Sequence, residues 1–222
     1  MVGSVELPAY DAAGVGIDCQ LGQGTYVGLT GLRTGTDFER TTGLLDYDSS
    51  RLPGQRTLVS GTAEKIDYIE HQAGLLVNRI LAAEWFAELA YRFTRSEMEN
   101  TFPQLARPGE APPGTDQWAD LHEVRGALLY RRTRGFFARA EAGYYIQEGR
   151  QALRGIFGAA EAHRDRTFQL NLFAGWEFPR RQAEITIGLL NVTGDDYRFS
   201  ALNPLTELPR DRTLYMRLRL NF

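Results

Sequence analysis

Two stretches near the end of the chain decide its fold: TFQLNLFAGWEF at residues 167–178 and TLYMRLRLNF at residues 213–222. In both, every second residue is apolar, beginning at Phe168 and at Leu214, and the residues between them are mostly polar. A period of two places the two sets on opposite faces of a β-strand, whereas a helix would mix them on one face. These stretches therefore predict strands with one greasy face and one polar face.

The same period recurs upstream and predicts nine strands, most of them long for a soluble domain. Their expected ranges are 13–21, 24–38, 64–78, 84–97, 119–132, 136–148, 165–178, 182–192 and 212–222. Short connections are expected at 21–24, 79–83, 133–135 and 179–182, and long external loops at 39–63, 98–118, 149–164 and 193–211. Alternating short and long connections are typical of outer-membrane barrels, which have tight periplasmic turns and longer external loops.

Alternation alone does not say which face is outside, because a soluble lipocalin-like barrel has the same period with the faces exchanged. Three features favour a membrane: opposite charges on neighbouring strands of the polar face, strands long enough for a tilted crossing of about 9 to 11 residues, and aromatic residues next to the short turns. The predicted fold class is all-β, an antiparallel transmembrane β-barrel. Its lumen-facing charges would be Glu84, Glu88, Arg92, Glu123, Arg125, Arg139, Glu141, Glu184, Arg217 and Arg219, and its membrane girdle Trp85, Phe136, Trp176 and Phe178.

Composition excludes several other classes of protein. The 25 basic and 28 acidic residues are spread along the chain without a basic run, so nucleic acid is not an expected partner. Cys19 is the only cysteine, and the three histidines are scattered, so no internal disulfide, metal site or cofactor is expected. We interpret His122 beside Glu123, and His163 near Asp165, as ordinary rim residues and predict that the protein is not an enzyme.

The chain is expected to be a single domain over residues 1–222, with residues 1–12 irregular. Nine strands is an odd number, whereas bacterial single-chain barrels have an even number. The first ten residues also lack the features of a secretory signal. We therefore expect the C-terminal part of a larger barrel, with a ten-stranded closed barrel as the second choice.

The C-terminal hairpin resembles the last hairpin of TonB-dependent outer-membrane receptors. The resemblance lies in IGLLNVTGDDYR at residues 187–198, followed by PRDRTLYMRLRLNF at residues 209–222. In that family a strand ends in an Asn-Leu-(Thr/Phe)-Asp-x-x-Tyr stretch, and an Arg-rich strand with a terminal Phe closes the chain after an external loop. Val192 and Gly194 are small departures from this pattern.

The resemblance implies a bacterial outer-membrane barrel that takes up a scarce ligand such as a siderophore, with a plug domain, outside this chain, that would connect it to TonB. Phe222 resembles the signal read by the barrel-assembly machinery, and outer-membrane lipid would surround the wall. If ligand is bound from outside, the external loops are the candidates, with Phe102, Trp118, Tyr197, Arg198 and Phe199. Two alternatives stay open: a barrel that anchors periplasmic tetratricopeptide repeats or exports polysaccharide, and a small surface barrel without transport.

Overall fold

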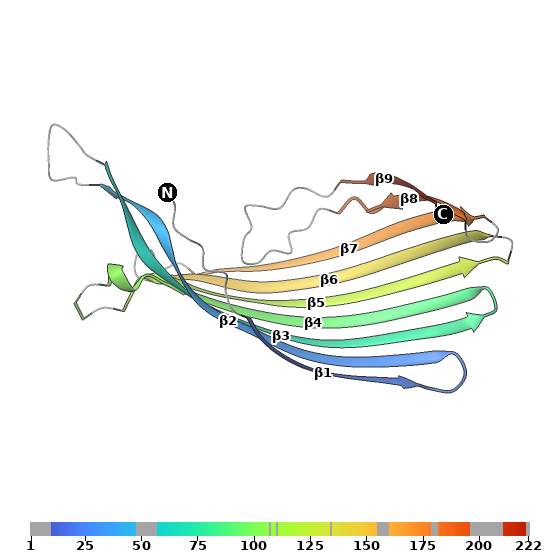
Figure 1. Ribbon diagram of the computed structural model, residues 1–222, viewed down its shortest axis with the longest axis horizontal. Helices are drawn as coiled ribbons and strands as arrows, with labels where there is room; N and C mark the ends of the chain where they lie inside the picture. Colours follow the sequence, from blue (N-terminus) through green and yellow to red (C-terminus); the bar gives the residue numbers. More distant parts are fainter. Residues whose placement is uncertain are drawn as a thin grey trace.

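The computed structural model of the chain describes residues 10–47, 57–106, 108–109, 111–133, 135–154, 160–178, 182–195 and 211–220, with the side chains of 44–47, 57–60, 151–154, 160–161 and 163 left aside. These residues form one antiparallel sheet in which each strand pairs with its neighbours in the sequence (Figure 1). The strands are β1 (Tyr10–Gln20), β2 (Thr25–Tyr47), β3 (Thr57–Ala82), β4 (Trp85–Thr101), β5 (Gly114–Arg131), β6 (Phe136–Arg154), β7 (Ala160–Glu177), β8 (Ala183–Leu190) and β9 (Thr213–Leu220). A short 3-10 helix, η1 (Pro103–Leu105), follows β4. No helix in the described part of the chain is long and apolar enough to cross a membrane.

The nine predicted strands are all present, but β2 to β7 extend further toward the end opposite the short turns than expected. The range 39–63 was predicted to be a loop, yet β2 continues to Tyr47 and β3 begins at Thr57. The range 149–164 is likewise largely strand, and in the range 98–118 strands occupy both ends, up to Thr101 and from Gly114. The prediction was wrong there because it followed apolar alternation, which stops in these ranges, whereas the hydrogen-bond ladder does not need an apolar face. Figure 1 shows the β2–β3 hairpin rising beyond its neighbours at the end opposite the short turns.

The opposite end has tight turns, as predicted. Between β1 and β2, the amide of Leu21 donates to the carbonyl of Thr25 at 2.8 Å. Gly22 and Gly24 adopt φ of 65° and 85°, which glycine reaches without a steric penalty. At the N-terminus, residues 10–12 were expected to be irregular, but they pair with Thr34 to Thr36 as part of β1.

The two faces of the sheet differ in chemistry and in burial. One, the polar face, carries the charged residues that alternate with apolar residues along each strand. The other, the apolar face, carries Leu89, Leu172 and the apolar residues level with them on the other strands. The residues buried on the polar face are mainly hydrophilic: Thr62, Glu64, Gln117, Glu123, Gln147, Thr167 and Thr186. On the apolar face, by contrast, Leu89 is 53% exposed and Leu214 is 76% exposed. Side chains converge on the concave side of a curved sheet, so this difference indicates that the sheet curls toward its polar face.

This distribution is inside-out for a water-soluble protein. Among the described residues the buried apolar ones are Ile66 and Ala119, and both lie on the polar face. Each large apolar side chain left in water forgoes about 1.5 to 3 kcal/mol of burial free energy, and soluble monomers rarely expose continuous apolar patches above a few hundred Å². The apolar face therefore requires an apolar surrounding medium.

The apolar face also shows how the strands tilt. On β1 the apolar residues of this face start at Ala13. When the paired residues are followed from each strand to the next, Ala13 lies level with Arg164 on β7. On β9 the run starts at Leu214, whose row reaches Leu172 on β7. On β7 the two levels, at Arg164 and Leu172, are eight residues apart. Since eight steps from strand to strand separate β1 from β9, the start of the apolar band shifts by one residue per strand. With about 3.4 Å per residue and about 4.8 Å between strands, the strands tilt by about 35° from the normal to the band, as they do in membrane barrels.

Candidate functional site

The polar face is the candidate functional surface because it gathers nearly all the charges that the sequence singled out. The structure places nine of the ten predicted residues on it: Glu88, Arg92, Glu123, Arg125, Arg139, Glu141, Glu184, Arg217 and Arg219. Glu84 is the exception. It lies in the turn between β3 and β4, where its carboxylate contacts Tyr130 of the apolar face.

The most buried charge at the middle of the wall is Glu123 on β5. Its side chain is 6% exposed and lies between two guanidinium groups. Arg92 on β4 donates from Nε at 2.9 Å and from Nη2 at 2.5 Å, while Nε of Arg125 lies 2.9 Å from the other carboxylate oxygen. Both arginines remain about half exposed, which lets their outer edges stay hydrated. Charge-assisted hydrogen bonds from the two guanidinium groups replace the water that the Glu123 carboxylate loses within the wall.

Similar pairs continue toward the short-turn end. Arg139 and Glu141 pair along β6 at 2.7 Å, and Arg217 on β9 pairs with Glu184 on β8 at 2.6 Å. Arg131 also forms an ion pair with Glu177 on β7. The sequence analysis missed this last pair because both residues lie at strand ends, where the apolar alternation gives little guidance.

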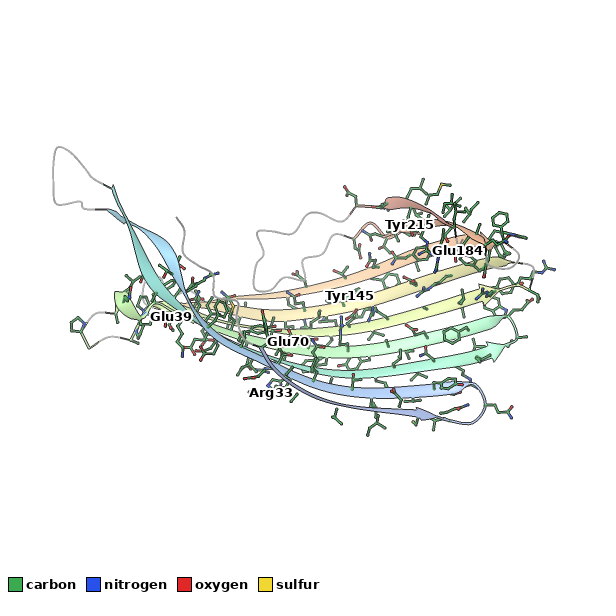
Figure 2. All side chains as sticks on the ribbon, viewed as in Figure 1. Arg33, Glu39, Glu70, Tyr145, Glu184 and Tyr215 are labelled. Atoms are coloured by element: carbon green, nitrogen blue, oxygen red, sulfur yellow. The ribbon has the colours of Figure 1, made fainter. Side chains whose placement is uncertain are left out.

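A pocket of about 400 Å³ opens on the polar face at this end. Its walls combine the ion pairs above with apolar side chains: Leu129, Phe137, Phe173, Leu190 and Tyr215. Figure 2 shows Glu184 and Tyr215 close to the short-turn end, with Tyr145 near the middle of the sheet and Glu39 at the other end. The pocket is therefore an amphipathic hollow in which the formal charges are already paired.

Glycines let aromatic rings lie flat on this part of the wall. Gly175 on β7 is covered by the ring of Phe137 on β6, and Gly188 on β8 is covered by Phe173 on β7, where an added Cβ would lie 2.5 Å from the ring. The Phe173 ring then meets Tyr215 edge-on at 6.5 Å. The aromatic rings occupy the space that the absent side chains leave, a known device for stabilising glycine in sheets.

A second polar cluster lies near the external end, on β2, β3 and β4. Glu64 is 3% exposed and accepts hydrogen bonds from Arg40 at 2.6 Å, from Asn100 at 2.5 Å and from Thr42. Burial by itself would raise the pKa of Glu64, but the hydrogen bonds from its three partners lower it below the usual value, so the carboxylate is ionised at neutral pH. Gln104 of η1 accepts from the amide of Ala63 at 3.1 Å, which ties the helix to β3. The cluster joins β2, β3, β4 and η1 through side-chain hydrogen bonds at the end opposite the short turns.

The apolar face has aromatic residues near both of its borders. The predicted girdle residues Trp85, Phe136, Trp176 and Phe178 all lie at the short-turn end, and Trp85 packs against Tyr130 with centroids 4.9 Å apart. A second group at the other border was missed by the sequence analysis: Tyr91, Phe93, Tyr144 and Phe168. From Phe168 to Trp176 along a tilted strand is about 22 Å, close to the height of about 25 Å of the apolar band of membrane barrels.

The structure also places two further candidate residues, His122 and Phe102. His122 faces the apolar side, where its Nδ1 lies 2.9 Å from the hydroxyl of Tyr91, while the adjacent Glu123 faces the polar side, so the two cannot act together. No group of three potential metal ligands is present in the part of the chain that the structure describes. Phe102 lies in the connection after β4 as predicted.

Trp118 was predicted to lie in an external loop, and this prediction was wrong. It is part of β5, on the apolar face, paired with Glu97 and Arg150. The misassignment has the same cause as the other loop errors, since the apolar alternation fails around Trp118, whose neighbours on the same face are Asp116 and Asp120. Tyr197, Arg198, Phe199 and Phe222 lie outside the described residues.

Comparisons with known proteins find a likeness in fold but none in sequence. No protein-family model matches the sequence, and no curated protein does. Among solved structures, the closed form of the ferric-catecholate import receptor Fiu from E. coli K12 matches with a TM-score of 0.56 and 10% identity, over 82% of this chain and 32% of the receptor. The open form of that receptor matches with a TM-score of 0.55, 10% identity and coverage of 82% and 35%. The fold therefore resembles part of the β-barrel of that receptor, and this chain spans about a third of the receptor's length.

Proposed function

We propose that this chain forms part of the wall of an outer-membrane receptor of the TonB-dependent type, which takes up a scarce ligand such as a siderophore. The observation that carries the proposal is the inside-out sheet: a polar face of paired charges, including Glu123 between Arg92 and Arg125, backed by an exposed apolar face. The likeness to an import receptor supports it. So does the open sheet in Figure 1, whose edge strands β1 and β9 lie at opposite sides without pairing, as in part of the wall of a wider barrel.

In this proposal the polar face lines the lumen and its ion pairs keep the lumen hydrated, while the external end recognises the ligand. Phe102 and the loop at Tyr197, Arg198 and Phe199 are the proposed recognition elements. The remaining partners follow from the same reading: outer-membrane lipid against the apolar face, the barrel-assembly machinery at Phe222, and TonB through a plug domain outside this chain. The site is a transport surface rather than a catalytic one.

The test is an uptake assay in cells that produce the protein. We expect deletion of its gene to lower the energy-dependent accumulation of at least one ⁵⁵Fe-labelled ferric catecholate or ferric hydroxamate by about tenfold, and re-expression to restore it. A protonophore should abolish the difference between the two strains, because import through a receptor of this type depends on the energised inner membrane. Equal uptake of all these complexes with and without the gene would contradict the proposal.

A further inference from the structure

The polar face changes in chemistry beyond the level of Glu123, toward the end opposite the short turns. We call this part the outer polar surface and define it as the polar-face residues of β2 to β7 that lie further from the short turns than Glu123. On the other side of that level the face carries ion pairs, whereas here most of the polar side chains are uncharged. They include the hydroxyl groups of Thr34, Thr94 and Ser96 and the amides of Gln72, Gln117 and Gln147.

The few charges of the outer polar surface are mostly negative. Among its described side chains there is one guanidinium, that of Arg40, and there are three carboxylates, those of Glu64, Glu70 and Asp165. Glu70 marks the surface in Figure 2. Nε of Arg40 lies 2.6 Å from Oε2 of Glu64, and Arg95 of β4 faces the opposite side of the sheet. Within the described residues, this surface therefore offers an anion no guanidinium group that lacks a carboxylate partner.

Two amide oxygens of the outer polar surface are buried without a hydrogen-bond partner in the described part of the chain. They are Oδ1 of Asn100 and Oε1 of Gln117, and Gln117 is only 6% exposed. Asn100 donates from Nδ2 to Glu64 at 2.5 Å, which leaves its oxygen as an acceptor. An unmatched buried acceptor costs free energy until an N–H or O–H group reaches it, and an anionic oxygen has no proton to donate. Both oxygens therefore favour a ligand with donor groups over an anionic one.

We propose that the ligand taken up past this surface is an electrically neutral iron complex of the ferric trihydroxamate class, and that the outer polar surface discriminates against ferric tricatecholates. This inference rests on the import function proposed above and names its substrate class. Three hydroxamates neutralise the three positive charges of a ferric ion, whereas three catecholates leave three negative charges on the complex. An excess of carboxylates repels such an anion, while hydroxyl and amide side chains form hydrogen bonds with the neutral amide groups of a hydroxamate ligand.

The test compares two ⁵⁵Fe complexes in cells that produce the protein and in the same strain without its gene, both lacking other receptors for the two complexes. One is ferrichrome, a neutral trihydroxamate, and the other is ferric enterobactin, a tricatecholate with three negative charges. We expect the gene-dependent uptake of ferrichrome to exceed that of ferric enterobactin by about tenfold, because repulsion acts on the anion alone.

Cations added to the outer polar surface should weaken this preference. Thr34 pairs with Glu70, and Thr94 lies on the same face of β4; both are half-buried and uncharged. The double variant Thr34→Arg, Thr94→Arg should raise the uptake of ferric enterobactin relative to ferrichrome by about tenfold. The matched control, Thr41→Arg with Thr101→Arg, adds the same charges at the same end of the sheet but on the opposite face. Its uptake ratio should stay within about twofold of the wild type, since solvent and salt screen charges across the wall.

The amount of each variant in the outer membrane is measured first, by immunoblot and heat-dependent gel mobility. If the double arginine variant is absent, competition on the wild type decides: excess gallium ferrichrome should suppress ferrichrome uptake, whereas the same excess of gallium enterobactin should leave most of it. Equal or greater uptake of ferric enterobactin, competition by both gallium complexes, or a preference that the two added arginines leave unchanged would overturn the substrate class while import stands. The absence of gene-dependent uptake of any ferric complex would refute import itself, and the substrate class with it.

Discussion

Arginine in place of Leu89 will largely prevent the chain from inserting into lipid vesicles, whereas arginine in place of Ala127 will be tolerated. Leu89 is 53% exposed in the middle of the apolar run of β4, and an arginine at the bilayer midplane costs about 2 to 4 kcal/mol in a membrane barrel. Ala127 lies at nearly the same depth but on the polar face, directly between Glu88 and Glu141. A cation placed there gains two carboxylate neighbours.

Insertion is measured as the folded fraction in urea titrations with vesicles, followed by heat-dependent gel mobility and protease protection. The cost of the arginine at Leu89 is a large part of the free energy of unfolding of a small domain. The folded fraction of this variant should therefore fall several-fold even without urea. If the variant at Ala127 is the damaged one and the variant at Leu89 folds normally, the two faces have been assigned the wrong way round.

Valine in place of Gly175 will destabilise the C-terminal strands by about 3 kcal/mol, at the upper end of the cost of overpacking. A Cβ at this position would lie 2.5 Å from the carbonyl oxygen of Ile185 and would also collide with the ring of Phe137. The β7–β8 ladder comprises only the six pairs from Leu172 to Glu177, so a local separation at Gly175 interrupts its middle. Flexible side chains can move aside, but the backbone of β8 cannot do so without breaking this ladder.

The control for this substitution is Ala174→Val, the preceding residue, which is exposed on the apolar face. Urea midpoints in vesicles should differ clearly between the two variants, with the control close to the wild type. A Gly175→Val variant as stable as the control would show that β7 and β8 do not approach each other as closely as the structure has them.

The sequence predicted the strand number, the order of short turns and the two faces because these follow from local alternation. The stretch from Phe168 to Phe178 has one apolar residue at every second position, and a slip of one residue would turn the whole set to the wrong face. The position of Trp85 and Trp176 at the short-turn end of the apolar face follows from the same pattern, since aromatic residues beside short turns are visible in the sequence. Tyr91 and Phe93 carried the same signal for the second aromatic group, beside Arg95, and could have been recognised.

The sequence could not predict where the strands end, nor which charges pair. Between Asp37 and Lys65 the apolar residues do not alternate, since Leu44 and Leu45 are adjacent and so are Leu58 and Val59, so no periodicity distinguishes a long hairpin from a loop. Ion pairs such as Arg131 with Glu177 depend on register across three strands, which alternation within each strand does not specify. The cluster around Glu64 likewise joins three strands and becomes visible only once they are aligned.

The central claim is that the apolar face meets lipid and the polar face meets water, and spin labels on β7 test it most directly. In a Cys19→Ser background, a nitroxide is placed in turn at each position from 168 to 176 except Gly175, where an added side chain would collide with β8. The chain is folded in vesicles, and the collisions of each label with oxygen and with a water-soluble nickel complex are measured. The account predicts a period of two, with oxygen dominating at even positions such as Leu172 and the nickel complex at odd positions such as Asn171. The opposite phase, or even positions shielded from both reagents in a dry protein interior, would contradict it.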